Sequence, residues 1–287
     1  NFFINPDTGD VYICDNDNVM AQGTNSGIAG KAHYMAPEVV AGGKPDKYSD
    51  RLSLAIILFR MFFLDHPFDG ERVAKCPCLT DEHDRKFYGS EATFMFDPVK
   101  TNNAPVRGIH TNAIRRWPVF PRFFKEAFIK EFSEEKLQRA KTTRMLEKAW
   151  EDMLLRLRDN IVKCPLCGEE TLIDGENGNF TCVNCQRKFS VSRTINFSGR
   201  TFYLTNGTGL YFDTDGIPDA KVEKNPSDGM LMVRNLGDTK WLAETASGKP
   251  KQVDKGKSFP ALPGIKITVT VTNNGINSRI TGTVTQK

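Results

Sequence analysis

Two C-x2-C pairs, Cys164 with Cys167 and Cys182 with Cys185, constrain the fold of this 287-residue chain more than any other feature. The fourteen residues between the pairs allow each pair to sit on its own tight turn. Two such turns can close a tetrahedral site of four thiolates around one ion. No histidine or carboxylate suggests an open, water-bearing catalytic position. We therefore predict a closed zinc ribbon whose metal is structural.

The residues between the two pairs predict how the ribbon is built. Thr171 to Ile173 and Asn179 to Thr181 are expected to form one hairpin around residues 174–178, and Gly168 relieves the turn after the first pair. The alternative is a set of four buried or redox-active cysteines. It is disfavoured because a redox motif needs only one C-x-x-C pair.

Charge and hydropathy exclude several classes of protein. The formal net charge of +4 is small for this length, and Lys163, Arg187 and Lys188 beside the ribbon are too few to predict a phosphate-binding track. The most apolar run, Leu52 to Leu64, contains Arg60 and is too short to span a bilayer. We expect no signal peptide before it. Seven cysteines that include two metal-type pairs favour a reducing compartment, and we predict a cytoplasmic protein without membrane contact.

The chain reads as a multidomain α+β protein with three parts. Residues 1–160 are predicted to be mainly helical, with helices at Asp50 to Leu64, Pro121 to Phe132 and Thr143 to Arg158. Residues 161–190 form the ribbon. Residues 191–287 contain short β-rich segments separated by Gly, Asn, Asp and Pro, which predicts an all-β sandwich.

Four motifs in the first part share a fixed order. Asn1 opens a predicted hairpin, N-F-F-I-N-P-D-T-G-D-V-Y-I-C-D, that ends at Asp15. The segment G-K-A-H-Y-M-A-P-E follows, and then Asp50 at the start of the apolar helix, with H-P-F-D-G after it. In this order and spacing the first 160 residues resemble the carboxy-terminal lobe of the serine/threonine protein kinase family.

The resemblance implies metal-binding or structural roles for six residues and places two further hydroxyls in the activation loop. Asn1 and Asp15 would hold the magnesium ions on the nucleotide phosphates, with Asp17 as a further oxygen ligand. Glu38 would form a buried ion pair with Arg144, and Asp50 would accept backbone N–H groups of the catalytic loop; both roles are structural. Thr24 and Ser26 lie where the family carries activation-loop phosphorylation.

Two departures from the family pattern affect the expected activity. Asn16 and Asp17 follow the metal-binding Asp15, where the family has Phe and Gly, and Lys31 replaces the usual Thr. No catalytic residue is present, because the resemblance places the catalytic base upstream of Asn1, together with the glycine-rich loop and the phosphate-binding lysine of the amino-terminal lobe. We expect Mg-ATP to bind only in a parent protein that includes that lobe.

Three further features carry weaker implications. F-Y-G-S-E-A-T-F-M-F-D-P, followed by I-R-R-W-P, resembles an insert in a bacterial subgroup of kinase-like proteins that carry zinc ribbons, where it would be a packing collar or a docking surface. The last part resembles a degenerate forkhead-associated domain without the phosphothreonine-reading loop. Cys76, Cys78 and His83 lack a fourth ligand and are read as ordinary side chains rather than a second metal site.

The sequence therefore leaves three functions open. The first is the carboxy-terminal part of a serine/threonine protein kinase, inactive without the amino-terminal lobe, whose zinc and β modules dock protein substrates or signalling partners. The second is a pseudokinase scaffold without catalysis. The third is a zinc-ribbon nucleic-acid binder, which would bind DNA or RNA in a salt-sensitive manner and is the least favoured.

Overall fold

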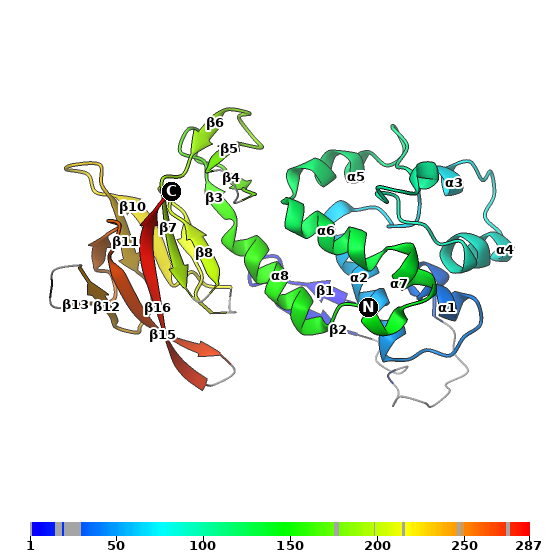
Figure 1. The fold of residues 1–287 in the computed structure, drawn as a ribbon, viewed down its shortest axis with the longest axis horizontal. Helices are drawn as coiled ribbons and strands as arrows, with labels where there is room; N and C mark the ends of the chain where they lie inside the picture. The colour runs from blue at the N-terminus through cyan, green and yellow to red at the C-terminus, as the bar shows by residue number, and fades with distance from the viewer. Residues whose placement is uncertain are drawn as a thin grey trace. The chain divides into compact units, whose positions relative to one another are not determined.

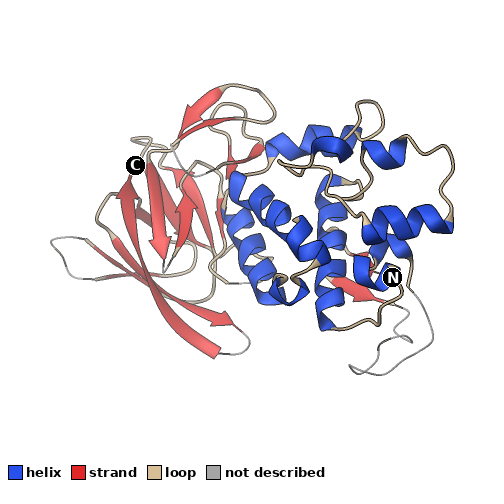
Figure 2. Ribbon diagram, turned by 45° about the vertical axis from the view of Figure 1, so that its right-hand side comes forward, coloured by secondary structure: helices blue, strands red, loops and turns tan. Residues whose placement is uncertain are grey.

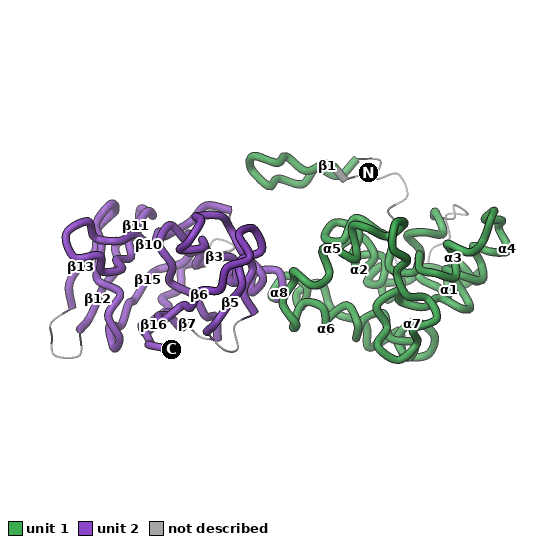
Figure 3. The backbone as a smooth tube through the Cα atoms, turned by 90° about the horizontal axis from the view of Figure 1, so that it is seen from above, with its two compact units in different colours: residues 1–152 green, residues 153–287 purple. Residues whose placement is uncertain are grey.

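The computed structural model describes residues 2–14, 19, 30–174, 178–197, 199–213, 216–245, 248, 250–273 and 276–287. The chain divides into two compact units, Asn1–Asp152 and Met153–Lys287 (Figure 3). No helix in the described ranges is both long and apolar enough to cross a bilayer.

Unit 1 consists of one small hairpin and a series of mostly short helices (Figures 1 and 2). The elements in chain order are β1 (Phe2–Ile4), β2 (Val11–Ile13), η1 (Ala32–Tyr34), α1 (Pro37–Val40), α2 (Lys47–Phe63), α3 (Glu71–Ala74), α4 (Asp81–Asp84), η2 (Arg85–Ser90), η3 (Thr101–Asn103), α5 (Thr111–Arg116), η4 (Trp117–Val119), α6 (Arg122–Glu131), α7 (Glu134–Gln138), η5 (Lys141–Thr143) and α8 (Glu147–Asp159).

Helix α2 forms the centre of unit 1. Asp46 caps its first turn by accepting hydrogen bonds from the backbone N–H groups of Tyr48 and Ser49, both at 2.9 Å. The Ser49 hydroxyl accepts from the Asp46 N–H in return, which completes a capping box. The helix ends at Leu64, whose φ of 57° is left-handed. Its inward side chains are fully buried and apolar: Leu52, Ala55, Ile56, Phe59 and Phe63.

The core around α2 is aromatic. The ring of Phe59 meets those of Phe94 and Phe128 edge-on, each with a centroid distance of 5.5 Å. Phe128 in α6 also contacts Trp150 in α8, with centroids 5.1 Å apart. Edge-to-face packing of this kind adds to the stabilisation that comes from burial. These contacts join α2, α6 and the start of α8 to the loop that follows Ser90.

Unit 2 begins with the end of α8 and continues as antiparallel strands. Its described strands form sheets of six strands (order β13-β12-β15-β16-β7-β8), four strands (β14-β11-β10-β9) and two strands (β3-β4 and β5-β6). The strands are β3 (Ile161–Lys163), β4 (Glu170–Leu172), β5 (Asn179–Thr181), β6 (Lys188–Ser190), β7 (Arg193–Phe197), β8 (Arg200–Tyr203), β9 (Gly209–Leu210), β10 (Ala220–Lys224), β11 (Leu231–Asn235), β12 (Trp241–Glu244), β13 (Lys251–Val253), β14 (Ser258–Pro260), β15 (Lys266–Asn273) and β16 (Ile276–Gln286).

Alternating apolar side chains build the core of unit 2. Val222 and Val233 from the four-stranded sheet share one buried cluster with Trp241 and Ile267 from the six-stranded sheet. Gly282 in β16 lies opposite Phe197 in β7. A Cβ at position 282 would lie 2.6 Å from the Phe197 ring, so only glycine leaves room for that ring.

The predicted fold class, a mainly helical lobe followed by an all-β sandwich, is wrong. The chain is mixed, with 32% helix and 25% strand. Among the described residues of unit 1, only α2, α6 and α8 reach ten residues, because proline, glycine and asparagine keep much of residues 64–121 in loops and single turns. Unit 2 includes the end of α8, and its described strands are divided over four sheets.

The long elements agree with the sequence patterns that predicted them. A hairpin joins β1 to β2, and α2, α6 and α8 correspond to the three predicted helices, although α8 begins at Glu147 rather than Thr143. The predicted ribbon pairing is wrong: β4 pairs with β3, and β5 pairs with β6. Each C-x2-C turn is itself the tip of a hairpin, so the strands that flank one cysteine pair bond to each other.

Candidate metal centre and the Glu38–Arg144 ion pair

The first cysteine turn is closed by backbone hydrogen bonds at the end of the β3–β4 hairpin. The Gly168 N–H donates to the Cys164 carbonyl at 2.8 Å, and the Cys164 N–H donates to the Glu169 carbonyl at 2.8 Å. Gly168 has a φ of 80°, a conformation that glycine adopts without strain. This turn brings Cys164 and Cys167 to one side of the hairpin tip.

The second cysteine turn repeats this geometry at the end of the β5–β6 hairpin. The Gln186 N–H donates to the Cys182 carbonyl at 3.0 Å, and the Cys182 N–H donates to the Arg187 carbonyl at 3.0 Å. Gln186 stands where the first turn has Gly168, and it too is left-handed, with a φ of 57°. The two hairpins therefore present their cysteines in equivalent ways.

The four sulfurs form one compact group. All four Sγ atoms lie within 4.8 Å of one another, with Cys164 to Cys185 at 4.0 Å and Cys167 to Cys182 at 3.7 Å. Tetrahedral zinc with Zn–S bonds of about 2.3 Å requires S–S separations of about 3.8 Å. The donor set and its spacing fit a single tetrahedral metal ion.

Burial and nearby N–H groups shift the pKa values of the cysteines in different directions. The backbone N–H of Arg187 lowers the pKa of Cys185 to about 6. Burial raises the pKa of Cys182 to about 11. Burial also raises the pKa of Cys164, but the N–H groups of Leu166 and Cys167 outweigh it and the net change is downward. A bound dication would favour the thiolate form of all four.

A cluster of aromatic and aliphatic side chains holds the two hairpins together. Phe180 and Phe189 from β5 and β6 share one buried cluster with Val162, Ile173 and the cysteines. Arg187 connects the turns, because its Nη2 donates to the Leu166 carbonyl at 2.9 Å. The site is thus closed on the protein side, as expected of a structural metal centre rather than a catalytic one.

The sequence of the cysteine module carries no excess of positive charge. Residues 161–191 carry three cations against four carboxylates. Lys163 is paired with Glu170 at 3.3 Å, and the Arg187 guanidinium is engaged with the Leu166 carbonyl. A phosphate-binding surface needs an excess of unpaired cations.

In unit 1 the structure brings together Glu38 and Arg144. Arg144 Nη1 donates to Glu38 Oε1 at 2.7 Å, and Nη2 donates to Oε2 at 2.9 Å. The Arg144 side chain is 0% exposed and that of Glu38 is 28% exposed. Arg144 also donates to the Tyr48 carbonyl at 3.0 Å, so it joins α1 to the first turn of α2.

A second buried ion pair, which the sequence did not reveal, supports Arg144. Glu131 is completely buried, and its Oε2 accepts from Lys136 Nζ at 2.6 Å. The same carboxylate accepts from the Met145 N–H at 3.1 Å, directly after Arg144. A charged residue inside the helical pattern of α6 gives no signal that it is buried rather than solvated.

Of the remaining predicted site residues, only Asp50 lies in the part of the chain that the structure describes. Asn1, Asp15 and Asp17 lie outside the described residues, as do Thr24 and Ser26. Asp50 is an exposed residue in the first turn of α2. The partial desolvation of its carboxylate and the nearby Asp46 carboxylate raise the pKa of Asp50.

The three possible ligands at residues 76–83 do not converge. Cys76 Sγ contacts the Cys78 carbonyl oxygen at 3.2 Å, while the His83 ring contacts the Thr80 hydroxyl at 3.0 Å. In the described part of the chain, the group at Cys164, Cys167, Cys182 and Cys185 is the one set of three or more such side chains close enough to hold a metal ion.

No protein-family model matches this chain.

Proposed function

We propose that this chain is part of a serine/threonine-protein-kinase-like protein in which the four-cysteine module and the strands after it dock protein partners. The observation that carries the proposal is the bidentate bond between Glu38 and Arg144. Glu38 ends the Ala-Pro-Glu motif, and its partner lies far along the chain beside the buried helix α2. The kinase resemblance implies an ion pair between this Glu and an Arg late in the lobe, and Arg144 was the expected partner.

Phosphoryl transfer also needs residues that this chain does not supply. Asn1 and Asp15 would provide oxygen ligands for magnesium, while a catalytic base and a phosphate-binding lysine would come from the rest of the protein. The chain's own contribution would be one wall of the nucleotide site and the frame built on α2. Activity is therefore proposed for the complete protein only.

The test is a phosphorylation assay on the protein expressed from its own start codon, with casein and radiolabelled ATP. Asp15→Ala should lower label transfer by about 100-fold or more, because it removes a ligand of the metal ion. Asp7→Ala is the matched control, since Asp7 lies in the turn of the same hairpin. Equal label transfer by the parent protein and both variants would contradict a kinase.

The runner-up function is a scaffold that binds partners without catalysis. The sequence Asp15-Asn16-Asp17 favours it, because Asn16 and Asp17 replace the hinge residues expected after the metal-binding carboxylate. A scaffold predicts background transfer by the parent protein and no Mg-ATP-dependent rise in its melting temperature. A kinase predicts label transfer above background and a rise in melting temperature with Mg-ATP.

We also propose that the metal ion at the four cysteines is zinc. Four thiolates at tetrahedral spacing suit zinc, which has no redox chemistry and contributes folding free energy directly. Elemental analysis should find one zinc per chain. Cys164→Ser and Cys182→Ser should lose it, whereas Cys76→Ser should keep it. Zinc retention by both ligand variants, or iron in its place, would contradict the assignment.

A further inference from the structure

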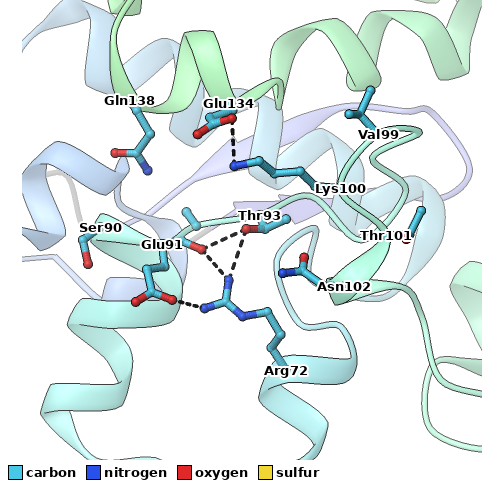
Figure 4. A pocket seen from close by; sticks show the side chains of 11 residues that line it. Arg72, Ser90, Glu91, Thr93, Val99, Lys100, Thr101, Asn102, Glu134 and Gln138 are labelled. Carbon is cyan, nitrogen blue, oxygen red and sulfur yellow. Dashed lines mark hydrogen bonds and ion pairs between the residues drawn. The ribbon is translucent and has the colours of Figure 1, made fainter.

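Unit 1 contains a pocket of about 670 Å³ that none of the proposed sites uses (Figure 4). It lies between α3, the loop at residues 90–93, the turn at residues 99–102 and α7. Two ion pairs line it: Arg72 with Glu91, and Lys100 with Glu134. Figure 4 shows the Gln138 and Asn102 side chains at opposite sides of the pocket.

The floor of the pocket is fixed by a buried side chain. Asn103 is 2% exposed, and its Nδ2 donates to the carbonyls of Phe68 at 2.9 Å and Thr93 at 2.7 Å. Its Oδ1 accepts from the Arg72 N–H at 3.2 Å. One amide thus ties α3 and the loop at residues 90–93 to the turn that carries Lys100 and Asn102.

The first wall is equally well held. Arg72 pairs with the Glu91 carboxylate, and its Nη1 also donates to the Glu91 carbonyl at 2.9 Å and to Thr93 Oγ1 at 3.2 Å. The Arg72 guanidinium lies 5.3 Å from the centre of the Phe87 ring. These contacts keep one cation and one carboxylate at a defined place on the wall.

The opposite wall is anchored through α7. Lys136 of this helix faces inward to the buried Glu131, so Glu134 and Gln138 are left to face the pocket. Glu134 Oε2 lies 2.8 Å from Lys100 Nζ, and both side chains are about half exposed, at 50% and 46%. Gln138 Nε2 donates to the Gly89 carbonyl at 3.3 Å, which leaves its Oε1 to accept from a ligand.

The lining excludes several ligand classes. A polyanion such as a nucleotide would meet two carboxylates for two cations, and an apolar ligand would find only Ala92 and Val99. No set of pocket carboxylates in the described residues is spaced to hold a metal ion. The lining instead offers amides, hydroxyls and charges of both signs. In the part of the chain that the structure describes, the Ser90 and Asn102 side chains have no hydrogen-bond partner.

We propose that this pocket binds an extended peptide segment that carries one carboxylate and one ammonium or guanidinium group. The amides of Asn102 and Gln138 pair with the peptide backbone. The ligand's carboxylate pairs with Lys100 at one end of the pocket, where the exposed Lys100–Glu134 ion pair contributes only about 0–1 kcal/mol and is readily exchanged. The ligand's ammonium or guanidinium group pairs with Glu91 at the other end, where the Glu91 side chain is 48% exposed.

The experiment titrates the 287-residue chain with capped peptides Lys-(Ala)n-Glu and Glu-(Ala)n-Lys, with n from one to four. The readout is the side-chain amide NMR signals of Asn102 and Gln138. At least one peptide should bind with a Kd below about 1 mM and about tenfold more tightly than the matched Gln-(Ala)n-Gln peptide. Glu-(Ala)n-Glu and maltopentaose should bind more weakly still.

Reversal of one ion pair tests the assignment without changing the net charge. The double variant Lys100→Glu with Glu134→Lys should bind the preferred peptide about fivefold less tightly. Reversal of the exposed pair Lys255–Asp238 in unit 2 is the matched control and should change nothing. Asn102→Ala, which removes a side chain that bonds to nothing else, should weaken binding about threefold if the reversed pair unfolds the protein.

Three results would overturn the proposal. One is no peptide binding up to about 5 mM, a concentration that detects even weak complexes. Another is equal binding of the charged and neutral peptides. The third is perturbation of Asn102 and Gln138 by maltopentaose or by the dianionic peptide in preference to the mixed-charge peptides, which would assign the pocket to a sugar or an anion instead.

Discussion

Both Nη atoms of Arg144 donate to the two carboxylate oxygens of Glu38, a residue 106 positions earlier in the chain. Glu38→Ala should destabilise unit 1 by about 3 kcal/mol, because it leaves the fully buried guanidinium of Arg144 without its counter-charge. The value is at the low end for such pairs since the Glu38 side chain is 28% exposed. Urea unfolding followed by tryptophan fluorescence measures the loss.

The exposed pair Arg122–Glu126, 61% exposed on both sides, is the control for this prediction. Glu126→Ala should cost less than about 0.5 kcal/mol. Replacing both Glu38 and Arg144 by methionine should recover part of the loss, because neither charge is then left unpaired. A loss below about 1 kcal/mol for Glu38→Ala would show that water replaces the carboxylate.

Asp46 should contribute to stability in two separable ways. Its carboxylate caps α2 and also pairs with Lys141 at 2.7 Å. Asp46→Ala should cost about 1 kcal/mol through the lost cap, whereas Asp46→Asn should keep the cap. Equal losses in the two variants would assign the effect to the ion pair instead.

Asp46 also makes a prediction about pH. Burial raises its pKa, but hydrogen bonds from Lys141, Ser49 and Tyr48 outweigh this, and the pKa in the folded protein is below the usual 3.8. Stability from this shift is therefore present above pH 3.8 and is lost as the pH falls through the lowered value. The stability difference between the parent protein and Asp46→Asn should shrink over that range in urea titrations.

The two cysteine turns should respond differently to substitutions at their equivalent glycine and glutamine. Gly168→Ala places a Cβ on a residue with a φ of 80° and should cost about 1–2 kcal/mol. Gln186→Gly removes such a penalty but loosens the unfolded chain, so its net effect should stay within about 0.5 kcal/mol of zero. Chelator-induced metal release and thermal melting measure both. A large loss from Gln186→Gly would show that the bond from its Nε2 to the Val183 carbonyl is needed.

The contact between Gly282 and Phe197 predicts a rescue. Gly282→Ala should cost about 1–3 kcal/mol, because the new methyl group meets the Phe197 ring at 2.6 Å. Adding Phe197→Leu should remove part of this cost, so the two changes together should be less harmful than their sum. Strict additivity in a double-mutant cycle would contradict the steric explanation.

The sequence predicted the elements that repeat or are long. Asp50 to Leu64 is apolar on nearly every face, which requires burial on nearly every face, and α2 is the centre of unit 1. The spacing of the four cysteines predicted their convergence because a C-x2-C turn fixes two sulfurs locally. Glu38 and Arg144 were paired through a family resemblance, since residues so far apart leave no local signal.

The remaining features depend on contacts that a local pattern does not contain. β10 and β12 were not predicted, because each is only four or five residues long and β10 carries three charged residues. The pairing within the cysteine module was wrong because a turn between β4 and β5 is as compatible with the sequence as the turns that form. The pocket walls come from four separate segments, and only their folded arrangement brings Arg72 near Glu91 or Lys100 near Glu134.

The repeated cysteine turns have a consequence for protein turnover in the cell. Each half of the module is a hairpin of three-residue strands, too short to persist alone in water, and supplies only two of the four sulfurs. Departure of the ion would therefore release both hairpins in a single step. About thirty residues in the middle of the chain would then become accessible to proteases. Depletion of the metal would therefore shorten the lifetime of the protein.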